Sequence, residues 1–338
     1  MTTTTHDRPT VRASVTTVGQ TMKAGRHGKG PARWVVLAAA TVTVSVIGGI
    51  PSLTAAGASS VPPSPDAGSG VVDELIEVGG ARLHLHCSGA GDTTVVLIAG
   101  LGDGGDYWGA IEPTVAKSAR VCSYAHFGAG TSDPPPGPQT FSTRANNLHE
   151  LLRTAGEHSP YLLVGHSFGG AEAVMFASMF LDDVSGVLLL DASPANWITV
   201  LCSVVDDGSD GAASYGELCA SLSDPANNAE HLDAPAAFAE VSEVTSLGDL
   251  PMIVDTAAEH PWGLAPSEQG RFNEEWTAGQ DHWVSLSSAA QFQSVDNTGH
   301  YIAVDRPDVV TLQIAALLAR GTDCFQSTEP TPAVSPTS

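Results

Sequence analysis

The sequence predicts a mostly parallel α/β sheet that the chain enters through an antiparallel hairpin. Aliphatic runs of strand length recur along the chain, and from residue 93 onward they alternate with patterns of helical period. Runs this uniformly apolar suit strands that helices cover on both faces. Gly79-Gly80 joins the first two runs, and a glycine pair between strands is typical of a tight hairpin.

The predicted elements follow one another in order along the chain. Strands are expected at residues 73–78, 81–87, 93–99, 120–125, 161–165, 186–191, 251–255 and 292–296. Helices are expected at about 107–118, 143–156, 169–180, 267–290 and 307–320. Residues 192–249 form a longer interval than a simple crossover needs, so we expect a cap over the site there, after strand six. The cap contains Cys202 and Cys219, and a disulfide between them is the first expected pairing.

Residues 1–58 have the order of a secretory signal peptide. A basic stretch precedes the weakly apolar run Trp34–Ile50, and Ala56-Gly57-Ala58 follows as a cleavage site. A translation start at Met22 would give this signal a more usual leading region. The alternative is an uncleaved membrane anchor with the protein facing outside, although a run of this length spans a bilayer only marginally. We expect a secreted protein with a linker at 59–71, a folded domain at 72–325 and a disordered tail at 326–338.

Charge and cysteine content narrow the function classes. The chain carries a net charge of −23, and removal of residues 1–58, with six of 14 basic and one of 37 acidic residues, would leave 8 against 36. A surface this acidic repels nucleic acid, so no nucleic-acid partner is expected. The five cysteines all follow the signal segment, where export favours disulfides, and an odd number leaves at least one outside an internal pair.

The segment Gly165-His166-Ser167-Phe168-Gly169 has the G-x-S-x-G spacing of a nucleophile turn between a strand and a helix. The two glycines let the strand and the helix approach without Cβ clashes, while the serine takes strained backbone angles. The helix that starts after the serine directs its positive end toward an oxyanion. We predict that Ser167 is a nucleophile; the alternative is a structural turn of small residues.

A serine nucleophile needs a base, and His300 is the best candidate among the twelve histidines. It lies just past the last predicted strand, in a loop that begins with Gly299 and leads into the final helix. In a parallel sheet this loop lies at the same carboxyl edge as Ser167, so the imidazole is expected to reach the hydroxyl.

Five segments in this order resemble the α/β-hydrolase fold superfamily: "TTVVLIAGLG", "ARVCSYAHFGAGTSDPPP", "YLLVGHSFGG", "VLLLDASP" and "TGHYIAVDRPDVV". The resemblance covers roughly residues 72–320 and is closest to actinobacterial secreted or membrane-associated hydrolases of the esterase and lipase kind. It implies an eight-stranded sheet, a Ser-acid-His triad in that chain order, a cap between strands six and seven, and no cofactor. It also implies that the second and fourth strands are neighbours, which would pair Cys87 with Cys122 and leave Cys324 unpaired.

Three carboxylates compete for the acid position of the triad. Asp191 ends the sixth predicted strand, where its side chain would emerge at the catalytic edge, and it is our first choice. Glu259 lies after the seventh strand, near the position that the superfamily uses more often, and Asp255 lies within that strand. Geometry rather than sequence identifies the third member of a triad, so the alternatives stay open.

The backbone N–H groups of Leu101 and Phe168 are the expected oxyanion hole. The substrate pocket is expected to include Gly100, Trp108 and His166, with His166 packing beside the catalytic serine rather than acting as its base.

One segment departs from the superfamily pattern. The chain reads "YAHFG" at Tyr124–Gly128 where relatives often read "YDRAG". The loss of the Asp-Arg pair leaves the support of this loop open, and His126 is expected to line the pocket.

Two other patterns have simpler explanations. Gly100, Gly102 and Gly105 fit G-x-G-x-x-G, but they follow the third strand and no acid stands about 20 residues on to hold a ribose. His84, His86 and Cys87 look like metal ligands until strand alternation puts the cysteine on the opposite face, so no metal is expected.

The expected function is a serine hydrolase that cleaves small-molecule carboxylic esters through an acyl-enzyme on Ser167. Amidase or proline-peptidase, thioesterase and perhydrolase activities share this triad and remain alternatives. A catalytically inactive secreted binding protein of the same fold is a further alternative. Membrane contact is expected only through an uncleaved signal segment.

Overall fold

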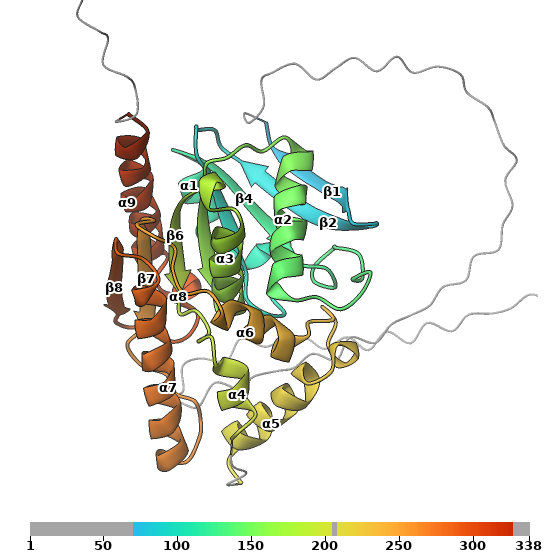
Figure 1. The fold of residues 1–338 in the computed structure, drawn as a ribbon, viewed down its shortest axis with the longest axis vertical. Coiled ribbons are helices and arrows are strands. Elements are labelled where there is room, and N and C mark those ends of the chain that lie inside the picture. The colour runs from blue at the N-terminus through green and yellow to red at the C-terminus, as the bar shows by residue number, and fades with distance from the viewer. Residues whose placement is uncertain (1–69, 205–207, 327–338) are drawn as a thin grey trace, which may run out of the picture. The chain divides into compact units, whose positions relative to one another are not determined.

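One eight-stranded sheet, in the order β1-β2-β4-β3-β5-β6-β7-β8, forms the centre of the fold (Figure 1). A computed structural model describes residues 70–204 and 208–326, and for the last six of these it describes only the backbone. The strands are β1 (Val72–Val78), β2 (Ala81–Ser88), β3 (Thr94–Ile98), β4 (Arg120–Ala125), β5 (Tyr161–His166), β6 (Val184–Leu190), β7 (Met252–Ala257) and β8 (Ala290–Val295). β2 pairs antiparallel with β1 and β4, and the other neighbours pair in parallel. The predicted sheet is therefore confirmed.

Helices cover both faces of the sheet and separate its core into two clusters. On one face lie α2 (Phe141–Ala155), α3 (Phe168–Met179) and α7 (Pro266–Ser285); on the other lie η1 (Gly105–Trp108), α1 (Glu112–Val115), α8 (Ile302–Asp305) and α9 (Pro307–Gln326). A short η2 (Leu181–Asp183) leads into β6. Strands β3 to β7 are almost wholly buried, as uniformly apolar strands between two helical layers must be.

Local sequence explains where the helices begin and end. Thr140 caps α2 in a reciprocal pair with Thr143, and Gly156 ends it at a φ of 77°. The single helix predicted at 107–118 is instead two short ones, η1 and α1. Gly109 follows the first, and Pro113 lies in the first turn of the second, where its missing N–H costs nothing.

The interval between β6 and β7 holds α4 (Trp197–Leu201), α5 (Asp210–Leu222), η3 (Pro225–Asn227) and α6 (Ala234–Ser242). Phe238 of α6 packs edge-on against Phe168, with ring centroids 5.0 Å apart, at the point where α3 leaves β5. The interval therefore lies over the carboxyl edge of the strands, where a cap was expected (Figure 1).

Both predicted disulfides are present. Cys202–Cys219 joins the end of α4 to α5 within the cap, and Cys87–Cys122 joins β2 to β4. The second bond depends on the strand order, because Cys87 and Cys122 are direct partners in the register of these neighbouring strands. The side chain of Cys324 lies outside the described residues.

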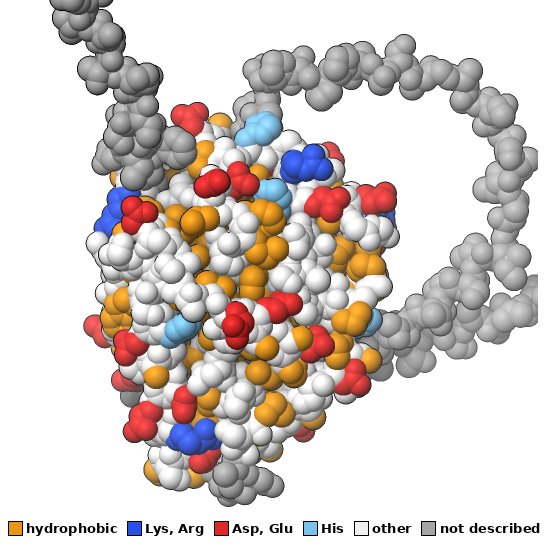
Figure 2. All heavy atoms as spheres, viewed as in Figure 1, with side chains coloured by type: hydrophobic (Ala, Val, Ile, Leu, Met, Phe, Trp, Pro, Cys, Tyr) orange, Lys and Arg blue, Asp and Glu red, His pale blue; other side chains and the backbone are white. Residues whose placement is uncertain are grey.

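The visible surface is acidic, as the net charge of −23 requires: on the face in Figure 2, Asp and Glu side chains are more frequent than Lys and Arg. Within the described part of the chain, no helix has the length and apolarity needed to span a bilayer. The predicted signal peptide, the start at Met22, nearly all of the predicted linker and the predicted tail lie outside the described residues.

Candidate active site

Ser167 occupies a strained turn between β5 and α3. Its backbone angles are φ 55° and ψ −122°, a conformation that residues with a side chain rarely adopt. The neighbouring glycines permit the turn because nothing larger fits. A Cβ on Gly165 would lie 2.4 Å from the carbonyl oxygen of Gly169, and a Cβ on Gly169 would lie 2.3 Å from that of Ala99. The geometry is that of a nucleophile turn, with the serine at its apex.

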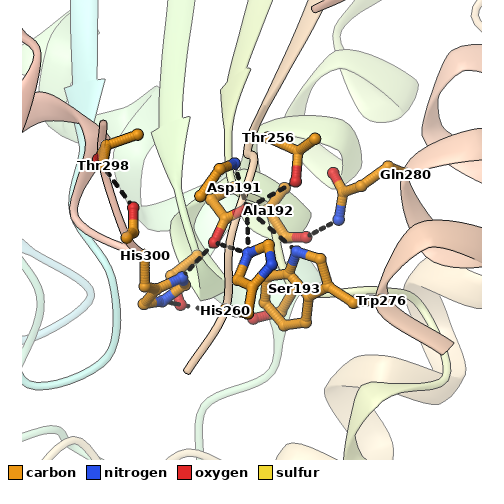
Figure 3. Close-up of polar contacts among 12 residues, drawn as sticks. Asp191, Ala192, Ser193, Thr256, His260, Trp276, Gln280, Thr298 and His300 are labelled. Atoms are coloured by element: carbon orange, nitrogen blue, oxygen red, sulfur yellow. Dashed lines mark hydrogen bonds and ion pairs between the residues drawn. The ribbon is translucent and has the colours of Figure 1, made fainter. Parts of the chain in front are cut away.

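The structure brings Ser167, His300 and Asp191 together, although the last two are 109 residues apart in sequence. The Ser167 hydroxyl donates to Nε2 of His300 at 2.9 Å. Nδ1–H of His300 donates to Oδ2 of Asp191 at 2.7 Å (Figure 3). Asp191 lies directly after β6, and His300 lies in the loop after β8, so both come from the carboxyl edge that holds Ser167. This chain of hydrogen bonds has the geometry of a serine–histidine–acid triad.

Asp191 is fully buried and receives hydrogen bonds from five groups at 2.7–3.1 Å. The donors are the Ala257 backbone N–H, the Thr256 hydroxyl and ring N–H groups of His260, Trp276 and His300. Figure 3 shows the last four of these around Asp191. Burial on its own raises the pKa of Asp191, but the hydrogen bonds from His260 and His300 outweigh it and hold the pKa well below its usual range. The carboxylate is therefore ionised and suited to stabilise an imidazolium.

The two alternative acids lie elsewhere. Glu259 is exposed in the loop after β7, and its neighbour His260 turns toward Asp191 instead. Asp255 is buried inside β7, and burial raises its pKa to about 7. Of the three candidates, Asp191 is the one whose carboxylate meets His300.

The loop after β3 lies against the serine, where the oxyanion hole was expected. A Cβ on Gly100 would lie 3.1 Å from the Cβ of Ser167, so a larger residue here would press against the serine and glycine lets the loop approach. Leu101 follows in the loop, and Phe168 begins α3 on the other side of Ser167. Glu230, from the cap, accepts a hydrogen bond from the backbone N–H of Gly102 at 2.6 Å. The cap therefore holds the segment that carries the expected oxyanion donors.

The expectation that His126 lines the pocket is wrong, because its side chain is 3% exposed and belongs to a buried ionic network. Its Nε2 contacts Glu172 at 2.9 Å, and Glu172 also accepts a hydrogen bond from the Tyr124 hydroxyl. Arg144 donates to Glu230 at 2.5 Å and lies 3.9 Å from Glu172. This network supports the "YAHFG" loop in place of the Asp-Arg pair of the relatives.

Two residues expected around the pocket have other places. Trp108 does not line the pocket. Its side chain is fully buried with Ile111 and Val115 in the core cluster on the face of the sheet that α9 covers. His166 is 1% exposed, stacks on Tyr107 at 4.7 Å and donates from Nε2 to the backbone carbonyl of His300 at 2.9 Å. Burial lowers the pKa of His166 to about 3, so the ring is neutral and supports the loop that carries the candidate base.

Sequence reasoning missed three residues that contact the site. The hydroxyl of Ser193 lies 3.4 Å from that of Ser167. Burial raises the pKa of Asp103, two residues after Leu101, to about 6, while the charge of His300 opposes this shift. His260 contacts both oxygens of Asp191 at 2.8–2.9 Å. Its position after β7, at the carboxyl edge, is the signal in the sequence that points to it.

A cavity of about 450 Å³ lies between α4, α6 and α7 and is lined in part by Ala195, Ile198 and Phe238. Phe238 touches Phe168, and Ala195 follows two residues after Ser193, so the cavity adjoins residues that flank Ser167. Its walls combine apolar side chains with a few polar groups, which is typical of sites for small organic ligands.

Among the described residues, the histidines and cysteine of β2 are engaged in other contacts. His84 binds Asp73, His86 binds Glu112, and Cys87 is in a disulfide with Cys122. The same disulfide accounts for the one group of potential metal ligands in this part of the chain, Cys87, Cys122 and Glu157, because a disulfide sulfur is not a thiolate.

Comparisons with known proteins agree with this geometry. Residues 93–203 match a family model described as alpha/beta hydrolase fold. The chain is 33% identical over 111 residues to a putative carbamate hydrolase, RutD, of Klebsiella pneumoniae, which covers 32% of this chain and 40% of that protein. It is 23% identical over 245 residues to the uncharacterized protein YqjL of Bacillus subtilis, which covers 72% and 90%. With most of its curated relatives, the chain matches less than half of their own length.

Solved structures give the same result. An esterase from Thermogutta terrifontis is similar with a TM-score of 0.53 at 21% identity, over 75% of this chain and 99% of that chain. An identity this low shows the fold alone. The chain has the α/β-hydrolase fold, as predicted, and the family model that residues 93–203 match is a model of this fold.

Proposed function

We propose that this protein is a serine hydrolase that cleaves carboxylic esters of small molecules by acyl transfer to water. Ser167 attacks the ester carbonyl carbon while Nε2 of His300 takes its proton. His300 then gives this proton to the departing alcohol, which leaves an acyl group on Ser167. A water molecule, deprotonated by His300, attacks the acyl carbonyl and releases the acid.

One observation carries the proposal: the continuous hydrogen-bonded path from the Ser167 hydroxyl through His300 to the ionised Asp191. When His300 becomes an imidazolium, Asp191 stabilises it. The N–H groups of Leu101 and Phe168 are the proposed donors to the carbonyl oxygen as it gains charge. Glu230 would maintain this hole by fixing Gly102, next to Leu101.

Several features favour a small ester as the substrate. The cavity of about 450 Å³ beside Phe238 is suited to an acyl group of moderate size. The net charge of −23 disfavours polyanions such as nucleic acid. Two similar proteins bear the names esterase and putative carbamate hydrolase, and both reactions begin with attack on a carbonyl.

The proposal includes export from the cell. The predicted signal segment in residues 1–58 supports it, as do the two disulfides, since such bonds persist in oxidising compartments. Detection of the protein in culture supernatant with an amino terminus after Ala58 would test export and cleavage together. Recovery of the full chain with the membrane fraction would favour the anchored alternative.

The decisive experiment is labelling with a fluorophosphonate, which reacts only with an activated serine. The wild-type protein is expected to be labelled on Ser167, and Ser167→Ala is expected to lose the label. Ser193→Ala is the matched control, because Ser193 lies 3.4 Å away and has no contact with His300 among the described residues. Absence of labelling in folded wild-type protein would support the inactive binding protein instead.

Turnover of p-nitrophenyl esters of increasing acyl length, with an aryl carbamate and an anilide in parallel, then defines the bond and the chain length. Ester turnover with little cleavage of the carbamate or the anilide is expected. Faster cleavage of the anilide than of every ester would replace the esterase proposal by an amidase.

A further inference from the structure

Asp191 carries a second imidazole besides the proposed base. His260 lies in the loop after β7, and its Nε2 is 2.9 Å from Oδ1 and 2.8 Å from Oδ2 of Asp191. Its side chain is 9% exposed, and Asp191 is fully buried. Figure 3 shows His260 and His300 approaching the same carboxylate from different elements. A triad requires only one imidazole on its acid, so the second one needs an explanation.

The ring of His260 is firmly held in this position. It stacks on Trp262 with centroids 4.9 Å apart and planes within 7°, and it lies 5.2 Å from the ring of Trp276. Its backbone carbonyl accepts hydrogen bonds from Gln269 at 2.6 Å and from the N–H of Trp262 at 3.0 Å. Such a set of contacts fixes both the ring and the loop, which is how a supporting residue orients a catalytic group.

His260 differs from the other supporting donors because it can change its charge. The Thr256 hydroxyl, the Ala257 N–H and the Trp276 ring N–H are neutral under all ordinary conditions. A neutral His260 donates one hydrogen bond and leaves the full charge of Asp191 available to His300. A protonated His260 would neutralise that charge and repel a proton on His300, because both rings share one carboxylate.

Three titratable groups lie near His260 among the described residues. Around His260, the titratable side chains are Asp191 at the end of β6, His300 beyond it and the exposed Glu259 in its own loop. Helix α7 presents Trp276 and Gln269, which do not titrate. A cavity of about 520 Å³ is lined by His260 and Glu259 among others.

We propose that His260 is a positioning residue for the triad: its N–H orients the Asp191 carboxylate toward His300. The inference rests on the proposed serine hydrolase function, because it assigns His300 as the base.

Two variants of His260 separate the effect of its hydrogen bond to Asp191 from the effect of its ring shape. His260→Phe keeps an aromatic ring to stack on Trp262 but has no donor, and we expect kcat to fall roughly 10- to 100-fold, the range typical for loss of a supporting hydrogen bond, with KM within twofold. His260→Gln keeps an N–H near the former Nε2 but cannot take up a proton. It should retain kcat within about threefold of wild type at pH 8, so that the amide N–H rescues what the phenyl ring loses. Glu259→Gln, next in sequence and exposed, is the control for both and should behave as wild type.

A wild-type kcat in His260→Phe, or a kcat in His260→Gln that falls as far as that of His260→Phe, would overturn the proposal. A spectrum of the wild-type protein provides a test that does not depend on variant folding. Its proton NMR should contain two strongly downfield imidazole N–H signals, one lost in His260→Gln and the other in His300→Gln. A single signal would also overturn the proposal. If wild type is neither labelled by fluorophosphonate nor active on esters, the proposed function fails instead, so the two failures are distinguishable.

Discussion

Asp191 and Asp255 are two buried aspartates on neighbouring strands with opposite behaviour. They are so close that the backbone N–H of Asp191 donates to the backbone carbonyl of Asp255 at 2.7 Å, and both side chains are fully buried. Asp191 has five donor groups, whereas neither carboxyl oxygen of Asp255 has a partner among the described residues. The pKa of Asp191 is held well below its usual range, and burial raises that of Asp255 to about 7. Burial is common to both, so the donors decide the charge.

Strand geometry explains why the donors reach only one of them. Side chains alternate between the faces of a strand, and Thr256 points toward Asp191, so Asp255 points to the opposite face. Ile253, two residues earlier, shares that face and packs in the cluster that includes Ile314 of α9. Asp191 has left its strand at a positive φ of 46° and lies at the edge, where loops from β7 and β8 supply polar groups. The same residue type is thus a site residue in one position and a buried neutral acid in the other.

The contrast between Asp191 and Asp255 predicts that Asp191→Asn has the largest effect on turnover. An amide cannot stabilise the imidazolium of His300, and a comparable change in a serine protease triad costs about 10⁴ in kcat. We expect a loss of roughly 10³- to 10⁴-fold in kcat on a p-nitrophenyl ester, with the circular dichroism spectrum unchanged. Glu259→Gln and Asp255→Asn are the controls, and each should remain within twofold of wild type. If Glu259→Gln instead abolished turnover, the assignment of Asp191 as the acid would be wrong.

Asp255→Asn should affect stability rather than catalysis, and the effect should grow with pH. The folded protein keeps the Asp255 proton up to a pKa of about 7, whereas the unfolded chain loses it near the ordinary aspartate pKa of 3.8. The unfolded state therefore binds fewer protons between these values, and the stability of wild type falls as pH rises through this window. The gap corresponds to about 4 kcal/mol at 1.36 kcal/mol per pKa unit.

The measurement is the free energy of unfolding in guanidinium for wild type and Asp255→Asn at several pH values from 4 to 8. Any constant cost of the amide cancels in the pH dependence of the difference, which should shift in favour of the variant by about 4 kcal/mol across the window. A difference that does not vary with pH would mean that Asp255 is already ionised in the folded state.

Some features of the fold and of the site could be predicted from the sequence alone. The sheet, the Ser167 turn and the position of His300 follow from local patterns: strand alternation, glycine spacing and a loop at a known edge. The Cys87–Cys122 bond followed once the strand order was assumed. In each case, neighbouring residues or a rule of topology carry enough information.

Contacts between distant segments could not be predicted. The donors to Asp191 come from residues 65 to 109 positions away, and which of them arrive depends on how α7 and the loop after β7 pack. Trp108 and His126 were misplaced for the same reason. Trp108 belongs to the core on the far face of the sheet, and His126 is drawn into an ionic network by Glu172. Residue type alone does not reveal such partners.

The smallest effect is expected from removal of a single neutral donor to Asp191. Thr256→Val preserves the shape of the β-branched side chain in β7 but deletes the hydroxyl that donates to Oδ1 at 2.8 Å. A hydrogen bond to a charged group contributes about 1.5–3 kcal/mol, and the other donors remain, so we expect kcat to fall about threefold to tenfold. Thr256→Ser, which keeps the hydroxyl and loses only a methyl group, is the matched control and should retain more than half of the wild-type kcat. Equal rates for the Val and Ser variants would show that the donors to Asp191 are redundant, in which case the number of donors would not explain why Asp191 and Asp255 differ.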